Sequence, residues 1–125
     1  MNTVLVNASR AENWRQVVAV ADGAIVAYSA VRRLPGWSSH VADIHLIVSH
    51  GWRRQGLGTA MAQAIFASAR DLGVAKVIVE LLDERCAGQA IFERLGFRVE
   101  GMLSNHARDR HGLPHDLLIM AYHIR

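Results

Sequence analysis

A chain of 125 residues, of which 51% are hydrophobic and 20% charged, has the length of one domain and is too apolar for intrinsic disorder. Its net charge of +3 comes from scattered arginines without an interleaved set of stacking aromatics, so we expect no nucleic-acid partner. The single cysteine, Cys86, excludes an intrachain disulfide, and no apolar run is long enough for a membrane span, so we expect a cytoplasmic protein.

The first part of the chain predicts strands joined by short turns. Two runs that read as strands lie on either side of a tight Ala-Asp-Gly turn at 21–23, which is typical of a hairpin. A loop containing proline, glycine and serine then leads to a further strand. The expected strands are 4–6, 14–20, 24–31 and 41–48.

A glycine-rich segment follows these strands and opens a helix predicted for about residues 56–72. Gly56 and Gly58 let the backbone approach a ligand closely and leave the amides of the first helical turn unobstructed. A helix N-terminus carries partial positive charge, and the guanidinium forks of Arg53 and Arg54 match phosphate oxygens. The segment therefore predicts a phosphate site, with an ordinary helix-capping turn as the alternative.

Two better-known phosphate loops do not fit this segment. A P-loop needs Gly-Lys followed by Ser or Thr, whereas Thr59 follows Gly58 directly. A dinucleotide fingerprint needs a third glycine where this chain has Met61. The helical period places six residues on the inward face of the helix: Leu57, Met61, Ala64, Ile65, Ser68 and Leu72.

The remaining segments predict a β-α-β crossover and a closing hairpin. Residues 74–82 are almost continuously apolar, as expected of a strand that is covered on both faces and parallel to its predecessor. A short helix follows, with Asp83 as its N-cap and Gly96 after its end. Two strands, 97–107 and 116–123, then flank a turn with Gly112 and Pro114. The order predicts a single α/β domain over residues 1–125 with a mixed central sheet.

Two motifs in this order resemble those of the GCN5-related N-acetyltransferase (GNAT) family. Arg53, Gly56 and Gly58 fill the three defining places of its Arg-x-x-Gly-x-Gly pyrophosphate motif, and the segment ending Gly96-Phe97 is similar to its second motif. The resemblance covers about residues 15–123. It implies a fold of the acyl-CoA N-acyltransferase type, acetyl-CoA as co-substrate, no metal, and acetyl transfer to a primary amine of a small molecule or peptide.

The same resemblance implies that backbone groups carry much of the cofactor binding. Ile47 and Val48 would offer strand-edge groups to the pantetheine where the parallel strands splay apart, although both could equally be sheet core. The pyrophosphate would be held by the segment that contains Arg53, Arg54, Gln55, Gly56, Leu57, Gly58 and Thr59.

The second motif departs from the family at its beginning. Aligned on Gly96-Phe97, the chain has Arg85, Gly88 and Phe92 where the family typically has Asn, Ala and Tyr. The family's tyrosine is the usual candidate to protonate the departing thiolate, and phenylalanine cannot do so. Phe92 is predicted to pack against the pantetheine arm or in the core. Candidates for the acid are water, Cys86, Ser104 and Tyr122.

The strand before the glycine-rich segment carries the candidates for a general base. Asp43, His45 and Ile47 alternate onto one of its faces. Asp43 stands where many family members carry a glutamate that acts through water. A base matters most for a lysine amine, whose pKa is about 10.4. We therefore expect Asp43 and His45 to be catalytic; the alternatives are a carboxylate bonded to backbone amides and a histidine at the edge of the core.

Three histidines crowd the predicted closing turn. His106, His111 and His115 have spacings that could indicate a metal site, but no cysteine accompanies them and a turn preorganises ligands poorly. We interpret them as solvated turn residues.

The beginning of the chain is short for the family. GNAT domains usually have a strand and two helices before the hairpin that we predict at 14–31, and those helices wall the acceptor site. Here an exposed sheet edge near residues 4–6 would favour a homodimer that supplies the missing wall; the alternative is a monomer whose first residues fold back. The shortened start and Phe92 also motivate an alternative function, a non-catalytic acyl-CoA-binding module.

Overall fold

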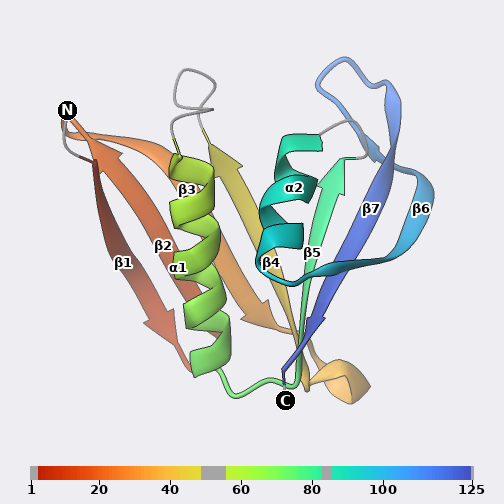
Figure 1. Cartoon of the computed structure of the whole chain (residues 1–125), viewed down its shortest axis with the longest axis horizontal. Helices are drawn as coiled ribbons and strands as arrows, with labels where there is room; N and C mark the ends of the chain where they lie inside the picture. Colours follow the sequence, from red (N-terminus) through yellow and green to blue (C-terminus); the bar gives the residue numbers. More distant parts are fainter. Residues whose placement is uncertain (1–2, 49–55, 83–85, 125) are drawn as a thin grey trace.

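The computed structural model describes residues 3–48, 56–82 and 86–124, which form a seven-stranded mixed sheet and two helices (Figure 1). The strand order is β1-β2-β3-β4-β5-β7-β6, and only β4 and β5 pair in parallel. This confirms the predicted fold class. The elements are β1 Thr3–Ala11, β2 Trp14–Ala21, β3 Ala24–Arg33, the short 3-10 helix η1 Gly36–Ser38, β4 Val41–Val48, α1 Leu57–Asp71, β5 Lys76–Leu82, α2 Cys86–Arg94, β6 Arg98–Arg108 and β7 Pro114–His123.

The predicted first hairpin is confirmed as β2 and β3. Asp22 and Gly23 connect the two strands, and both have positive φ angles, 51° and 78°. Two consecutive left-handed residues give the turn whose twist matches that of the flanking strands, and Asp-Gly is one of the sequences that adopt it readily. The parallel pair β4–β5 is joined through α1, as the predicted crossover requires.

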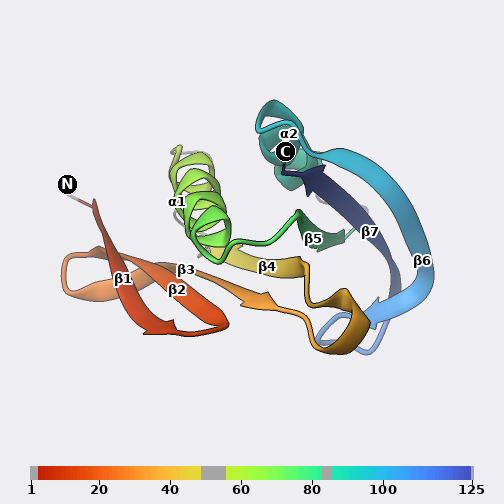
Figure 2. The same cartoon turned by 90° about the horizontal axis from the view of Figure 1, so that it is seen from below.

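Both helices lie on the same face of the sheet (Figure 2). The hydrophobic core fills the space between them and that face, with large side chains completely buried from strands and helices alike: Val31, Ile44, Met61, Ile65, Val77, Phe92 and Met120. Burying one such side chain stabilises the fold by roughly 1.5–3 kcal/mol. Among the described residues no helix covers the other face, which we call the open face.

The prediction that β5 is covered on both faces is wrong. Strand β5 was expected to be covered on both faces, but its buried residues are Val77 and Val79, whereas Ile78 is half-buried and Glu80 is exposed. A strand with apolar residues on both faces is buried on both only if helices or strands cover each face of the sheet. Here Ile78 is shielded in part by its neighbours within the sheet instead.

Helix α1 has about the predicted length, and its inward face agrees in large part with the prediction. Leu57, Met61, Ile65 and Leu72 are buried, and Ala64 packs against the core while it also lines a cleft of about 460 Å³. Ala62 and Ala69 are buried as well, which was not predicted. Ser68 lines the same cleft, whose other wall includes Leu5 and Arg15. Small residues flank the apolar stripe on both sides, so the helical period does not decide which of them point inward.

The chain before the hairpin is a longer strand than predicted. β1 pairs along the whole of β2, and only Glu12 and Asn13 separate the two strands, so no helix lies between them in the described stretch 3–48. β1 is an edge strand of the sheet, with Leu5 and Val6 37% and 41% exposed. In the described parts of the chain, no helix is long and apolar enough to cross a membrane.

Candidate active site

The parallel strands β4 and β5 diverge partway along their length. Their pairing ends at Ile44 and Val79, whereas β4 continues to Val48 alongside β3. The ends of β4 and β5 and the starts of α1 and α2 lie at the same end of the sheet (Figure 1). Ile47 and Val48 therefore lie beyond the last β4–β5 pair, in the region where the sequence predicts contact with a pantetheine arm.

The start of α1 has the features that an anion site needs. Gly56 is the N-cap residue, has a left-handed φ of 75°, and provides no side-chain cap. The first turn of α1 contains no acidic residue, so no carboxylate of that turn competes with an anionic ligand for the amides of residues 57–59. A Cβ atom on Gly56 would meet no atom of the described residues within 4 Å, so none of these residues fills the space beside the amides. The described part of this segment fits a pyrophosphate group.

The two glycines of the motif have different structural roles. Gly56 supplies a backbone conformation that other residues adopt at a cost. Gly58 lies under α2, because a Cβ atom placed there would be 3.2 Å from Cδ1 of Ile91. Gly58 therefore lets the two helices pack closely, a role that the sequence analysis missed. Three other predicted cofactor residues, Arg53, Arg54 and Gln55, lie outside the described residues.

Asp43 and His45 lie together on the open face of β4, as alternation along the strand predicts. Nε2 of His45 lies 3.2 Å from Oδ2 of Asp43. Asp43 is 4% exposed and His45 has 52% of its side chain exposed, so His45 lies between the buried carboxylate and solvent. Oδ1 of Asp43 is buried and has no hydrogen-bond partner among the described residues. The alternative of a carboxylate bonded to backbone amides is therefore not what the described structure shows.

Burial raises the pKa of Asp43 above its ordinary value of 3.8. The positive charge of protonated His45 opposes this rise in pKa, the negative charge of Glu80 adds to it, and Arg32 opposes it. A carboxylate with a raised pKa is a stronger base than one in water, because water stabilises the charged form that burial penalises. The site therefore holds a carboxylate that is suited to accept a proton.

Glu80 is a candidate that the sequence analysis missed. It lies on β5, is exposed, and is close enough to Asp43 to raise the pKa of that carboxyl. Its position was the signal in the sequence: Glu80 is the one acidic residue of the segment 74–82. It also lies two residues after Ile78, which pairs with Asp43, so the two side chains point to the same face. The carboxylates of Asp43 and Glu80 therefore lie in the same part of the open face.

Phe92 lies in the hydrophobic core. It is fully buried in α2, and its ring packs edge-on against Phe97 with 5.1 Å between the ring centroids. This is the core position that was the alternative to a cofactor contact; the contact with a pantetheine arm stays a prediction.

Tyr122, a candidate proton donor, lies at the end of α1 opposite to the glycine-rich motif, and its role as the acid stays a prediction. It lies on β7 beside the last turn of α1, where its hydroxyl oxygen accepts a hydrogen bond of 3.3 Å from Nη2 of Arg70. Gly56 and Arg70 are separated by the length of α1, about 20 Å at 1.5 Å per residue. Ser104 is exposed on β6. The side chain of Cys86 lies outside the described part of the structure.

One of the three histidines near the closing turn, His115, has its side chain in a hydrogen-bond network around Asp109, whereas His106 and His111 are exposed. Asp109 accepts hydrogen bonds from the amides of His111 and Leu113, and its Oδ2 lies 2.9 Å from Nε2 of His115. The hydrogen bond with His115 contributes most to lowering the pKa of Asp109. The described residues contain no group of three or more side chains placed to hold a metal ion.

The fold and the sequence together define the class of this protein. A sequence profile of the acetyltransferase (GNAT) family matches residues 4–97. The chain therefore belongs to the GNAT family of acetyltransferases, as the two motifs predict.

Particular relatives show how far the similarity extends. Over 86 residues the chain is 36% identical to "Probable N-acetyltransferase 14" of Danio rerio; this stretch is 67% of the chain and 30% of that relative. A GNAT-family acetyltransferase from Streptococcus pneumoniae superimposes with a TM-score of 0.80 at 18% identity, covering 91% of this chain and 69% of that one. A phosphinothricin acetyltransferase from Sinorhizobium meliloti, solved in complex with acetyl-CoA, gives 0.77 at 20% identity, covering 89% and 61%.

Proposed function

We propose that this protein transfers the acetyl group of acetyl-CoA directly to a primary amine of a small molecule or of a protein N-terminus. The observation that carries the proposal is the Asp43–His45 pair on the open face, beside the divergence of β4 and β5. The GNAT structure of Sinorhizobium meliloti that contains acetyl-CoA supports the choice of cofactor.

Bound acetyl-CoA would supply a thioester whose carbonyl carbon is open to attack by an amine. The amides of residues 57–59, with Arg53, Arg54 and Gln55, would bind its pyrophosphate. The backbone of Ile47 and Val48 would position the pantetheine. All these groups lie at or next to the start of α1, where no side chain caps the helix.

Asp43 would act as the base that removes a proton from the acceptor amine. Its Oδ1 has no hydrogen-bond partner among the described residues, while its Oδ2 is held by His45. Because the carboxylate is almost completely buried, the proton would reach Oδ1 through a water molecule rather than by direct contact. His45 would orient the carboxylate through its contact with Oδ2.

The alternative function is a non-catalytic module that binds an acyl-CoA. It is favoured by Phe92, which occupies the place of the family's usual proton donor, has no dissociable proton and is buried in the core. A thiol with a pKa near 8.5 is nevertheless a fair leaving group, so water is a sufficient proton source for turnover.

The release of free thiol from acetyl-CoA separates the two functions. Purified protein should release coenzyme A only when an amine from a panel of α-amines and lysine-like amines is added. Mass spectrometry should show one acetyl group on that amine. Binding of coenzyme A without amine-dependent thiol release would support the non-catalytic module and contradict the proposed transferase.

Two glycine variants test the cofactor site with a matched control. Gly56 and Gly73 flank α1, both have φ of 75°, and a Cβ atom at either would meet no atom of the described residues within 4 Å. Gly56→Ala and Gly73→Ala therefore carry a similar conformational cost, about 1 kcal/mol or more. We expect calorimetry to show coenzyme A binding weakened about 10-fold or more by Gly56→Ala alone. Equal affinities in the two variants would contradict the placement of the pyrophosphate.

We also propose that two copies of the chain associate through β1. β1 is a nine-residue edge strand with exposed Leu5 and Val6, and such an edge can pair with another strand. A sedimentation experiment at micromolar concentration should give twice the chain mass of 13.8 kDa. A monomer would contradict this proposal and leave the open face free for a bulky acceptor.

A further inference from the structure

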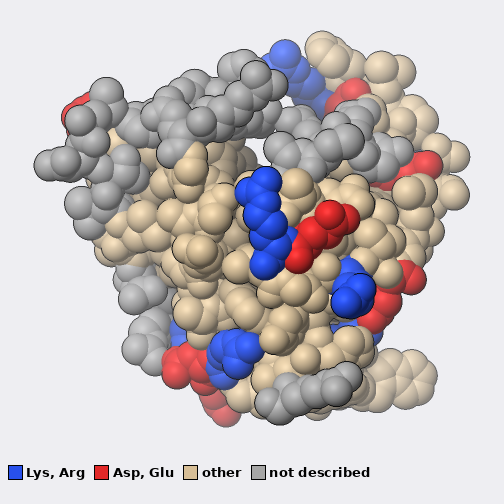
Figure 3. Space-filling model, in the orientation of Figure 1, with Lys and Arg blue, Asp and Glu red and all other residues tan. Residues whose placement is uncertain are grey.

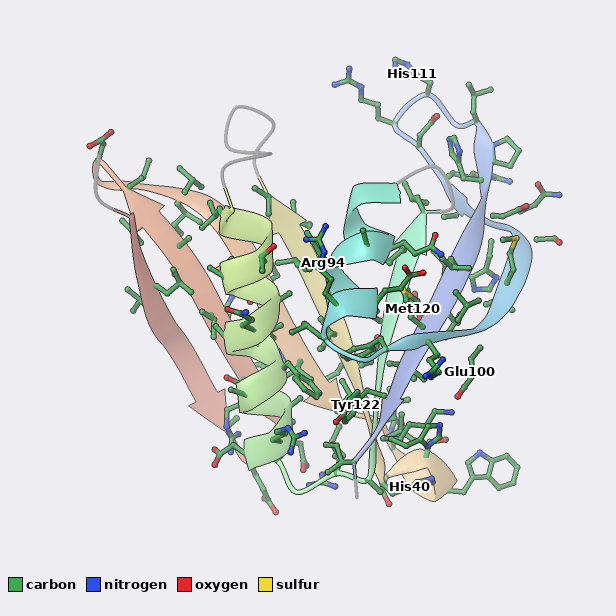
Figure 4. The ribbon with its side chains drawn as sticks, viewed as in Figure 1. His40, Arg94, Glu100, His111, Met120 and Tyr122 are labelled. Carbon is green, nitrogen blue, oxygen red and sulfur yellow. The ribbon has the colours of Figure 1, made fainter. Side chains whose placement is uncertain are left out.

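A second cleft lies at the opposite end of α1 from the proposed acetyl-CoA site. Its volume is about 470 Å³, and it is formed by the last turn of α1, the start of β6 and the end of β7. Side chains from all three elements line it: Arg70, Arg98, Glu100, Tyr122 and His123. Figure 4 shows Tyr122 beside the end of α1 and Glu100 near the start of β6.

The guanidinium group of Arg70 is held in place by aromatic rings rather than by a carboxylate. Its Cζ atom lies 5.0 Å from the ring centroid of Phe66 and 5.6 Å from that of Tyr122. Nη2 donates a hydrogen bond of 3.3 Å to Oη of Tyr122. Stacking orients an arginine and leaves most of its five N–H donors available. Arg70 is therefore a preorganised cation at the wall of the cleft.

The position of Tyr122 depends on a glycine. A Cβ atom on Gly96 would be 2.9 Å from Cε2 of the Tyr122 ring, so the missing side chain makes room for the ring. The Tyr122 hydroxyl accepts from Arg70 and keeps its own hydrogen as a donor. Arg70 and Tyr122 together present donors at one wall.

The cleft has more positive than negative charge. Its one carboxylate, Glu100, already has two partners: Nζ of Lys76 at 2.6 Å and Nε2 of His123 at 3.3 Å. The hydrogen bond with Lys76 is the main cause of the lowered pKa of Glu100, which keeps this carboxylate charged and engaged. Within the described part of the chain, neither Arg70 nor Arg98 has a carboxylate within ion-pair distance. Among the described residues, these two arginines of the cleft are therefore without a counter-charge within ion-pair distance.

Both arginines are exposed and so are accessible to a ligand. The pairing of β6 with β7 ends at Arg98 and Ala121, and β7 continues through Tyr122 and His123. On the face that Figure 3 shows, basic side chains are spread over the surface, mostly next to acidic ones, and form no continuous basic patch. Two unpaired arginines lining one cleft are therefore a local feature and not part of a general basic surface.

We propose that this cleft binds a small oxyanion, a phosphate or a carboxylate, between Arg70 and Arg98. Arginine forks match the paired oxygens of both groups, and the Tyr122 hydroxyl adds a neutral donor. The cleft is separated from the start of α1 by about 20 Å, the length of the helix, so this site is distinct from the pyrophosphate site. It gives the protein a second anionic ligand besides the proposed cofactor.

The site is tested by titrating the isotope-labelled full chain with inorganic phosphate and, separately, with succinate, followed by amide NMR shifts. We expect saturable shifts at Gly96, Arg98 and Tyr122, with a Kd on the order of 1 mM for the better ligand. The tighter of the two identifies whether phosphate or carboxylate is preferred. No saturable shift at these amides with either ligand would overturn the proposal.

Variants separate this site from general charge effects. Arg98→Gln should weaken binding about 10-fold without disturbing the fold, because Arg98 makes no ion pair in the described structure. Arg110→Gln, at an exposed arginine in the turn between β6 and β7, removes the same charge and should leave the Kd unchanged. Gly56→Ala should likewise leave it unchanged. Equal effects of Arg98→Gln and Arg110→Gln would show only general charge attraction and overturn the site.

Discussion

The two faces of the central sheet are built from the same strands and have opposite characters. Toward the helices, β4 and β5 present Ile44 and Val79, which are almost completely buried among apolar neighbours. Toward the open face, the same strands present Asp43, His45 and Glu80. Residues adjacent in sequence therefore differ in role because successive side chains of a strand point to opposite faces.

This difference separates the part of the molecule that stabilises the fold from the part proposed to do chemistry. The helix-covered face gains free energy from apolar burial. The open face contains a buried carboxylate oxygen without a hydrogen-bond partner in the described structure, which is an unfavourable arrangement for stability. Such groups are found more often at functional sites than elsewhere, because catalysis needs shifted pKa values.

The largest expected effect is on stability, from truncation of a core residue. Phe92→Ala removes a fully buried ring that packs against Phe97, and should lower the free energy of unfolding by about 3–5 kcal/mol. Ile47→Ala, at a side chain 65% exposed on the open face, should change it by less than about 0.5 kcal/mol. Urea denaturation followed by circular dichroism measures both. A large loss in Ile47→Ala would show that something covers the open face.

The next largest effect is on turnover, from a substitution on the open face. Asp43→Asn keeps the shape of the side chain and removes the base, so turnover should fall about 100-fold, equivalent to about 2.7 kcal/mol in the barrier. The loss should be greatest for amines of high pKa at neutral pH, while coenzyme A affinity stays nearly unchanged. Amine-dependent thiol release measures the rate.

A second carboxylate on the same face serves as the control for that variant. Glu80→Gln removes an exposed negative charge that raises the pKa of Asp43, so it should make Asp43 a weaker base and lower turnover by less than Asp43→Asn. A larger loss in Glu80→Gln would assign the base to Glu80. Wild-type turnover in Asp43→Asn would leave His45 or water as the proton acceptor.

Local patterns in the sequence predicted most elements, since alternation, helical period and glycine turns are local properties. The proximity of Asp43 and His45 followed from alternation alone and is confirmed. That Ser68 lines a cleft could not be predicted, because it depends on where β1 lies relative to α1. The distance of Tyr122 from the start of α1 likewise depends on how β7 packs against that helix. Such long-range placements are set by tertiary packing.

The smallest expected effect is a change in how stability depends on pH, and it has opposite signs at two aspartates. Burial raises the pKa of Asp43 above 3.8, so the folded state binds this proton more tightly than the unfolded state does. The stability from Asp43 is then fully present below pH 3.8 and is lost as pH rises through the folded pKa. Asp43→Asn cannot ionise, so its Tm should exceed that of the wild type at neutral pH, and the difference should shrink on acidification.

Asp109 provides the control of opposite sign. The hydrogen bond with His115, followed by those from the amides of Leu113 and His111, lowers its pKa below 3.8. The stability from Asp109 is therefore present above pH 3.8 and lost as pH falls through the folded pKa. Asp109→Asn should lower the Tm at neutral pH, and this deficit should shrink on acidification. Thermal unfolding by circular dichroism at neutral and acidic pH measures both variants. If Asp43→Asn also lowers the Tm at neutral pH, then His45 and Arg32 stabilise the Asp43 charge by more than burial penalises it.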